Sequence, residues 1–400
     1  MLVAASCFMQ LNGGARAEVS QAAVSANNAF AFDLYLKLAT TPGNIFFSPF
    51  SAESSLALAC TGAKGQTRDQ MARVLHLGAS NSADQAFGAL NKRLNDDQQL
   101  ANDMLGDDAM QGIPFQLYVV NSIWGQQQFR FGDDYLKIAK DDYGASLRLL
   151  DFKSSPESAR QQINDWVAQQ TREKIQNIIP GGALSDATRM VLANAIYFKA
   201  RWRVQFDKSR TKDAPFHTDP RRTISTPTMN GQSEAGYADI EGMRLLELPY
   251  FSRKMSMLIL LPPDIVSLEK SFGAQWLAGA LAKIQPSQVN VFLPKFKIDN
   301  GFRLDHPLQM MGMADAFSDT ADFSGIAPGN LFIDAVLQKA YIDVDEEGTE
   351  ATAATVVASA AGGLPEPPLP IVMKIDRPFI FLLRHKQTGA ILFMGRVMNP

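Results

Sequence analysis

The stretch Asp345-Glu346-Glu347-Gly348-Thr349-Glu350-Ala351-Thr352-Ala353-Ala354-Thr355-Val356-Val357-Ala358-Ser359 decides how this chain is interpreted. Its alanines favour a helix, but its threonines and valines favour a strand. Read as a strand, every second residue from Thr349 to Ser359 lies on one face, and all of these side chains are small or β-branched. No proline occurs from Gly348 to Gly363, so no backbone donor would be missing. The pattern therefore predicts a segment that can enter an existing sheet as a new strand.

Patterns elsewhere predict a mixture of helices and strands. We expect helices at 24–38, from about Ser51 to Gly62, after Thr67 with Gln70 at capping-box spacing, and from Ser155-Pro156-Glu157. The last of these would bury Ile163, Trp166, Val167 and Ile175 on one face. We expect strands at 116–124, 245–250, 255–261, 289–296, 331–344, 378–383 and 391–397.

Several of these stretches resemble signatures of the serpin family. Glu346 to Thr355 is similar to the hinge E-E-G-T-E-A-A-A-A-T, with Thr352 in place of an alanine. The other matches are N-I-F-F-S-P-F-S at 44–51, N-A-I-Y-F-K-A-R-W at 194–202, L-P-K-F at 293–296, and the C-terminal R-P-F and L-F-M-G-R-V-M-N-P. The resemblance implies an α+β serpin fold, with three β-sheets, about eight or nine α-helices and an exposed reactive-centre loop. Residues 18–400 would form one domain, with the loop at about 346–370.

The resemblance also implies three groups of functional residues. The hinge, where the loop begins to enter the sheet, would comprise Glu346, Glu347, Gly348, Thr349, Glu350, Ala351, Thr352, Ala353, Ala354 and Thr355. The shutter, under the centre of the main sheet, would comprise Ser48, Ser51, Asn194 and Gln338. The breach, at the end where insertion starts, would comprise Trp202, Lys295 and Glu346, with Lys295 paired to Glu346. We expect that pair to be exposed and to contribute about 0 to 1 kcal/mol.

Gln338 occupies the position where serpins usually have histidine. A glutamine can hydrogen-bond to Asn194 and Ser51 but cannot titrate, so a pH response of that histidine is not expected here. Trp202 could equally be an ordinary core aromatic, which is compatible with a place in the breach.

The bond that a protease would cut is not fixed by the sequence. Family spacing from Glu346 leads to Gly362, but the stretch from Gly348 to Phe379 is longer than in familiar members. The candidates are Ala360, Ala361, Gly362, Gly363 and Leu364. Small residues here, and the lack of Arg or Lys from Ala351 to Met373, favour an elastase-like or subtilisin-like target. The proline run at 365–370 would hold the loop extended, or serve as a ligand for a proline-binding domain.

Composition argues against several other functions. The net charge is −3, and aspartate pairs at 96–97, 107–108, 133–134 and 141–142 would repel nucleic acid and glycosaminoglycans. Only four histidines occur, none in metal-ligand spacing, and there is no C-x-x-C, G-x-S-x-G or G-x-G-x-x-G motif. We therefore expect no enzyme activity, no metal and no cofactor. Cys7 and Cys60 suggest no disulfide framework, and Cys60 reads as a buried side chain.

The N-terminus suggests export. An apolar run at 2–9 and Ala15-Arg16-Ala17 before Glu18 resemble a signal peptide or its remnant at 1–17, although the basic start is missing; an unstructured tail is the alternative. We expect a secreted or periplasmic protein. Lipoprotein anchoring through Cys7 is disfavoured because too few residues precede it. No stretch is long enough for a transmembrane segment.

The resulting hypothesis is a monomeric inhibitor of a serine protease, or else of a cysteine protease. The protease would cut the loop, remain covalently attached as its acyl-enzyme, and be carried along as the loop inserts into the main sheet. The alternative is a non-inhibitory serpin acting as a carrier, chaperone or structural protein. Such a protein would be expected to have proline, charge or bulk in the hinge, and this hinge has none between Ala351 and Thr355.

Overall fold

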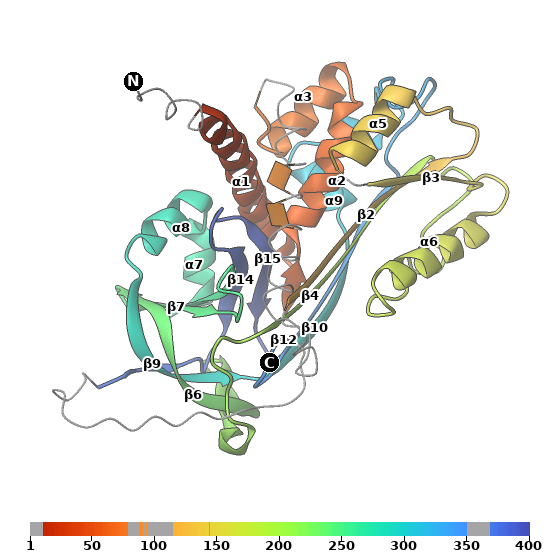
Figure 1. The fold of residues 1–400 in the computed structure, drawn as a ribbon. Coiled ribbons are helices and arrows are strands. Elements are labelled where there is room, and N and C mark those ends of the chain that lie inside the picture. Colours follow the sequence, from red (N-terminus) through yellow and green to blue (C-terminus); the bar gives the residue numbers. More distant parts are fainter. Residues whose placement is uncertain (1–10, 79–88, 91–92, 95–114, 144, 350–368) are drawn as a thin grey trace, which may run out of the picture.

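The computed structural model describes residues 11–78, 89–90, 93–94, 115–143, 145–349 and 369–400 (Figure 1). Eight α-helices and two hydrogen-bonded sheets are found in these residues. The candidate loop positions 350–368 lie outside the described part of the chain. The site is therefore built from the elements around the base of the loop.

A six-stranded sheet contains the strand that leads into the loop. Its order is β10-β11-β12-β4-β2-β3. β2 and β4 are antiparallel, whereas β4 and β11 run parallel. The strands are β2 (Phe115–Gln126), β3 (Ser146–Leu150), β4 (Met190–Arg201), β10 (Phe296–Arg303), β11 (Ala335–Val344) and β12 (Gly348–Thr349). This sheet corresponds to the main sheet of the sequence analysis.

The remaining strands form a nine-stranded sheet of order β1-β15-β14-β8-β7-β6-β9-β13, with β5 paired to β6. They are β1 (Ile45–Phe47), β5 (Lys212–Asp219), β6 (Arg222–Ile240), β7 (Met243–Pro249), β8 (Met255–Leu261), β9 (Gln285–Pro294), β13 (Ile371–Lys374), β14 (Phe379–His385) and β15 (Ile391–Val397). Three sheets were expected from the sequence. In the structure, hydrogen bonds between strands join two of these sheets into one. The cause is the long strand β6, which pairs with β5 and β9 along its first part and with β7 at its end.

The helices are α1 (Leu11–Leu38), α2 (Pro49–Thr61), α3 (Gly65–Val74), α5 (Asp133–Asp141), α6 (Pro156–Gln170), α7 (Ile265–Ser271), α8 (Ala274–Leu281) and α9 (Asp305–Met310). Two predicted starts were wrong, and one predicted capping bond does not form. α1 begins at Leu11, well before residue 24. α3 begins at Gly65 with Lys64 as its N-cap, and the Thr67 hydroxyl instead accepts from the Asp322 amide at 3.0 Å. Ser155 is the N-cap of α6, but its side chain makes no capping hydrogen bond.

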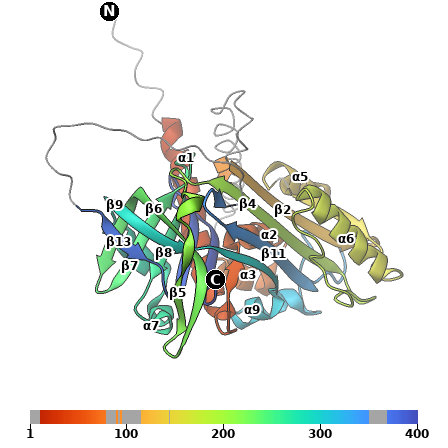
Figure 2. The ribbon, with the colours of Figure 1, turned by 90° about the horizontal axis from the view of Figure 1, so that it is seen from below.

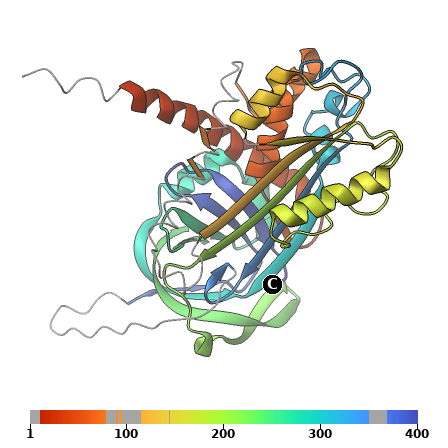
Figure 3. The same cartoon turned by 45° about the vertical axis from the view of Figure 1, so that its right-hand side comes forward.

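Helices cover both faces of the six-stranded sheet. α6 lies across one face, where Ile163 and Val167 pack with β4 residues such as Ala193 (Figure 3). Trp166 is partly buried in this cluster, and Ile175, beyond the helix end, is fully buried. α2 packs against the opposite face within the main core, in which Phe46, Leu56 and Phe198 are fully buried or nearly so. Figure 2 shows β2, β4 and β11 side by side, with α6 and α2 among the elements around them.

One core joins elements from both ends of the sequence. It includes Ala23 and Val24 of α1 as well as Phe393 and Val397 of β15. Cys60 is buried within it as a thiol. In the described part of the chain, no helix is both long and apolar enough to cross a membrane.

Candidate functional site

β4 and β11 pair directly along part of their length and are separated by a third strand beyond it. Seven residue pairs, from Ala335–Val191 to Tyr341–Tyr197, join the two strands directly. Beyond them, β12 lies between the strands: Thr349 pairs with Val344 of β11 and with Ala200 of β4, and Gly348 pairs with Arg201. We call this line between β4 and β11 the seam. One end of the seam is thus already occupied by the first two residues of a third strand (Figure 1).

A tight turn produces this arrangement. The Asp345 amide donates to the Gly348 carbonyl at 2.9 Å, which leaves Glu346 and Glu347 at the tip of a two-residue hairpin loop. The Asp345 carboxylate accepts from the Glu347 amide at 2.9 Å and from the Gly348 amide at 3.2 Å. Burial raises the pKa of Asp345, and these two amides offset part of that effect. The turn directs the chain back between the two strands.

Gly348 is required by the close approach of β4. A Cβ at this position would lie 2.1 Å from the Ala200 carbonyl oxygen and 2.7 Å from the Arg201 Cα. Its φ of +152° is also in a region that other residues rarely adopt. Any side chain here would push β12 out of the sheet.

Each of the two glutamates in the turn is buried and paired with a lysine. Glu346 is 3% exposed, and it accepts from Lys295 Nζ at 2.8 Å and from the Thr211 hydroxyl at 2.7 Å. Burial opposes ionisation of Glu346, but these two donors outweigh it and lower the pKa of the carboxyl group. Glu347 is 1% exposed, and Lys208 binds it and has its own pKa raised by that contact. Two ion pairs therefore hold the base of the loop.

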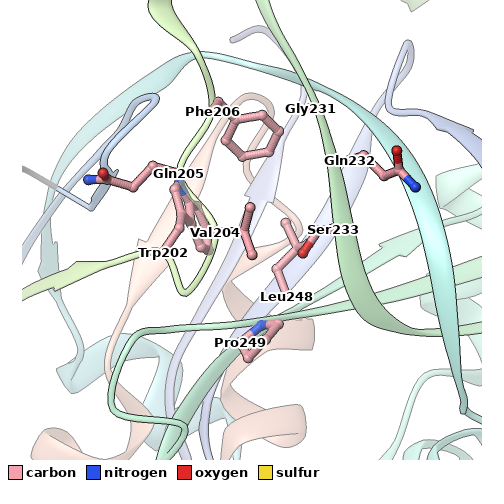
Figure 4. A pocket seen from close by; sticks show the side chains of 9 residues that line it. All are labelled: Trp202, Val204, Gln205, Phe206, Gly231, Gln232, Ser233, Leu248 and Pro249. Atoms are coloured by element: carbon pink, nitrogen blue, oxygen red, sulfur yellow. The ribbon is translucent and has the colours of Figure 1, made fainter. Parts of the chain in front are cut away.

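Trp202 fixes the backbone of the same turn. Its ring stacks on Tyr250 with centroids 4.7 Å apart, and its indole N–H donates to the Asp345 carbonyl at 3.0 Å. The Trp202 amide donates to the Glu347 carbonyl at 2.9 Å. Figure 4 shows a small cavity beside the ring, lined also by Phe206 and Leu248, with a volume of about 10 Å³. This volume is about that of a single water site, too small for a cofactor or substrate.

The middle of the seam has a different polar cluster. Gln338 of β11 accepts from the Ser48 amide at 2.9 Å and donates to the Ser48 carbonyl at 2.8 Å. The Ser48 hydroxyl caps α2 by accepting from the Ser51 amide at 3.1 Å, and it donates to the Leu392 carbonyl at 2.7 Å. All of these side chains are buried. The cluster ties β11 to α2 and to β15.

Asn194 and Ser51 lie in this buried region but form no side-chain hydrogen bond with Gln338, contrary to expectation, although Asn194 is the cross-strand neighbour of Gln338. The Ser51 hydroxyl donates to Asn121 Oδ1 of β2 at 2.7 Å. Asn194 Nδ2 donates weakly to the Leu337 carbonyl at 3.4 Å, and Asn194 Oδ1 has no hydrogen-bond partner among the described residues. The amide oxygen and nitrogen of Gln338 each bond to the Ser48 backbone, which orients the amide group toward Ser48 instead of Asn194 or Ser51.

The structure thus places the predicted residues in two groups. Trp202, Lys295 and Glu346 meet at the loop base, and the pair of Lys295 and Glu346 is not exposed as expected because its carboxylate is buried. Ser48, Ser51, Asn194 and Gln338 lie at mid-seam. Sequence reasoning missed Lys208, Thr211 and Asn121, and only the doubled glutamate hinted at a second lysine. Outside the described residues lie Glu350, Ala351, Thr352, Ala353, Ala354, Thr355, Ala360, Ala361, Gly362, Gly363 and Leu364.

Residues 25–400 match a family model described as serpin (serine protease inhibitor). The chain belongs to the serpin family. It is 40% identical to a serpin-like protein of Thermococcus kodakarensis, over 94% of this chain and 85% of that protein. It is 37% identical to the leukocyte elastase inhibitor of Bos taurus, over 94% of this chain and 99% of that protein. Human thyroxine-binding globulin, solved with its thyroid hormone, has a TM-score of 0.80, 29% identity and coverage of 96% and 99%.

These comparisons confirm the α+β serpin fold and the family predicted from the hinge signature. The family is described by its inhibition of serine proteases. Among the described residues, no group of three or more His, Cys, Asp or Glu side chains could hold a metal ion.

Proposed function

We propose that this serpin inhibits a protease by inserting its cut loop into the seam between β4 and β11. The observation that supports this most strongly is the position of β12, hydrogen-bonded to both strands at one end of the seam. After Glu350, the residues Ala351 to Thr355 have the small or β-branched side chains that a continuing strand requires. The parallel pairs below β12 would separate one after another as the strand lengthens.

In the proposed reaction, the catalytic serine of the protease attacks a carbonyl carbon in the loop, and the peptide bond breaks with release of a new amine. The protease stays attached through the resulting ester. The freed N-terminal arm then extends β12 and carries the protease along the seam. About 14 residues at roughly 3.3 Å each would move it about 45 Å.

Insertion gains hydrogen bonds because one ladder between β4 and β11 is replaced by two ladders to the new strand. With about 1 kcal/mol net for each added bond, the gain is on the order of 10 kcal/mol. This is comparable to the stability of a whole domain. It is enough to distort the active site of an attached protease before the ester is hydrolysed.

The proposed targets are elastase-like or subtilisin-like serine proteases, with a cysteine protease as the other option. Small residues at Ala360 to Gly363 fit the narrow specificity pocket of such enzymes. The elastase inhibitor among the relatives supports the same choice. Mass spectrometry of the C-terminal fragment released by cleavage would identify which of Ala360, Ala361, Gly362, Gly363 and Leu364 precedes the cut.

The decisive experiment incubates the purified protein with pancreatic elastase and separates the products on a denaturing gel. We expect a covalent band with the summed mass of the two proteins and a loss of elastase activity. An elastase whose catalytic serine is replaced by alanine should give no such band. Clean cleavage without loss of elastase activity would refute the proposed trapping.

A Thr349→Arg variant tests the insertion step itself. Thr349 already pairs with both strands of the seam, so an arginine there would place a charge at the point from which β12 must lengthen. Insertion should therefore stall, and the ester should be hydrolysed first. We expect the variant to be cleaved as an ordinary substrate. Thr320→Arg, at an exposed position, is the matched control and should inhibit like the wild type. Unchanged inhibition by the Thr349 variant would contradict seam insertion.

A carrier function is the second candidate, favoured by the similarity to thyroxine-binding globulin. A carrier would not need its loop to enter the seam. It would bind a small apolar ligand in the intact state and release a protease without trapping it. Equilibrium dialysis with thyroxine, alongside the elastase experiment, separates the two functions.

We further propose that residues 18–400 form one monomeric domain after export and removal of residues 1–17. The cleavage site would fall within α1, before the first buried residues at Ala23 and Val24. N-terminal sequencing of the protein isolated from its native host would find Glu18 if the proposal is correct. Retention of Met1 would contradict it.

A further inference from the structure

A second cavity lies close to the loop base and is much larger than the one beside Trp202. Its volume is about 370 Å³, and it shares Pro249 with the small cavity in Figure 4. Three cationic side chains line it, each from a different segment: Arg203 follows β4, Arg253 lies in the turn between β7 and β8, and Lys386 lies in the turn between β14 and β15. Convergence of three cations from separate segments indicates an anion site.

The acidic groups of this cavity only partly balance the charge. Glu234 pairs with Arg203 at 3.4 Å. Glu247, whose side chain is 13% exposed, is shared by Arg384 at 3.3 Å and Lys386 at 3.5 Å. It also accepts from the Ser256 hydroxyl at 2.7 Å. Among the residues that line the cavity, two carboxylates thus face three cations, and Arg384 takes a further share of Glu247.

Two guanidinium groups have unused donors. The side chain of Arg253 is exposed and makes neither an ion pair nor a hydrogen bond with any other described residue. Arg384 is 8% exposed, and its Nε is buried without a partner in the described part of the chain. The unpaired donors of Arg253, which lines the cavity, can bind an oxyanion there, whereas Arg384 is not among the lining residues. Guanidinium groups suit phosphate because their parallel N–H donors match its oxygens.

An apolar wall completes the cavity. Ile284, Pro249 and Pro286 line it together with Ala235 and Gly236. At Gly236 a Cβ would lie 2.6 Å from the Ile284 side chain and 3.2 Å from the Glu247 Cβ, so a larger residue would reduce the space. The cavity therefore offers cations on one side and hydrocarbon on the other.

We propose that this cavity binds a phosphate monoester, with the phosphate on Arg253, Arg203 and Lys386 and the organic group against Ile284 and the two prolines. The site is independent of the protease reaction. It is nevertheless next to the loop base, because the Arg203 amide donates to the Pro249 carbonyl at 3.0 Å and Arg203 follows Trp202 directly.

The test uses inorganic phosphate and phenyl phosphate as probes at constant ionic strength, with sodium chloride making up the difference. Binding is measured by isothermal titration calorimetry and by the shift in Tm of the intact protein. Phosphate also stabilises proteins non-specifically, so saturation and variants decide the outcome. We expect saturable binding, with phenyl phosphate several-fold tighter than phosphate because its ring leaves water.

Arg253→Gln should weaken binding about tenfold, the effect of losing one charge-assisted contact. Arg221→Gln removes the same charge from the exposed turn between β5 and β6, and should bind like the wild type. Lys386→Gln, a second variant in the cavity, should weaken binding similarly and guards against a change in the turn at Arg253. Equal binding by the Arg253, Lys386 and Arg221 variants, or a shift that never saturates, would overturn the proposal.

Discussion

The loop base and the middle of the seam hold the same pair of strands, β4 and β11, by different means. At the loop base, β4 and β11 are already separated by β12, and the turn is held by ion pairs at Glu346 and Glu347. At mid-seam the strands pair directly, and the neutral hydrogen bonds of Gln338 fasten β11 to the N-terminus of α2. The difference indicates where insertion begins and what resists it. In the proposed mechanism, entry starts at the turn, and the mid-seam cluster must yield before the strand can lengthen.

The largest expected effect comes from closing the entry. Gly348→Val would place a side chain against the Ala200 carbonyl, so β12 could no longer occupy its place. We expect inhibition of elastase to fall by more than tenfold while cleavage of the loop continues. Gly279→Ala, in α8, has open space around its Cβ and should behave like the wild type. The ratio of trapped to cleaved protein on denaturing gels measures the effect, and an unchanged ratio would place the entry elsewhere.

The next effect comes from loosening the mid-seam cluster. Gln338→Leu would leave the buried amide of Ser48 without a partner and its carbonyl with only the Ala52 amide at 3.2 Å, at a cost of about 1–3 kcal/mol to the intact state. Urea unfolding of the intact protein measures this loss. Gln232→Leu, at an exposed position in β6, is the control and should change stability by less than about 0.5 kcal/mol. A Gln338 variant as stable as the control would show that the mid-seam cluster does not stabilise the intact protein.

A buried carboxyl group on α2 provides a further test of how the mid-seam region is stabilised. Glu53 of α2 is fully buried, and neither of its carboxyl oxygens has a partner in the described residues. Burial alone raises its pKa well above the usual value. The folded state therefore keeps a proton that the unfolded state loses, so stability is full below about pH 4.5 and falls as pH rises.

We expect the wild type to lose about 1 kcal/mol between pH 5 and pH 6 through Glu53, on top of any other pH dependence. Glu53→Gln should remove this loss and flatten the curve of unfolding free energy against pH. The measurement is urea unfolding of both proteins at each pH. Parallel curves for the two proteins would show that Glu53 does not titrate in this way.

The smallest effect is expected at the ion pair of the loop base. Lys295 is 38% exposed in its side chain, so solvent screens the pair and Lys295→Met should cost only about 1 kcal/mol. Because the pKa of Glu346 is lowered, its contribution is present above about pH 4.5 and is lost as pH falls further. Urea unfolding at pH 7 and pH 3 should show the difference between wild type and variant at pH 7 only. A difference of the same size at pH 3 would mean that packing, and not charge, explains it.

The sequence predicted the family and the two polar groups, because their residues occur in contiguous motifs such as Asn44–Ser51. It predicted the contact of Lys295 with Glu346 but not the burial of that carboxylate, which depends on the turn formed by Asp345. It missed Lys208 and Thr211 because they come from a segment without a recognisable pattern. It also assigned the wrong partners to Gln338, since the choice between Ser48 and Asn194 depends on how α2 packs against β11.

The joining of two of the three expected sheets was not predicted, for a similar reason. Period-two alternation indicates that a stretch is a strand, but it does not say that β6 pairs with β5, β7 and β9 in succession. The start of α1 was missed because the residues from Leu11 to Arg16 include two glycines, which disfavour a helix. Local propensity therefore predicted which stretches are helices and strands, whereas long-range packing determined how the strands join into sheets.

The central claim is that the intact protein is metastable. It reaches its lowest free energy only after the loop is cut and enters the seam. Comparing the Tm of the intact protein with that of protein cleaved in the loop tests this claim most directly. We expect cleavage to raise Tm by about 10 °C, because a gain on the order of 10 kcal/mol is divided by an unfolding entropy of about 0.8 kcal/mol/K for a chain of 400 residues. A cleaved protein that melts at or below the temperature of the intact one would contradict the account.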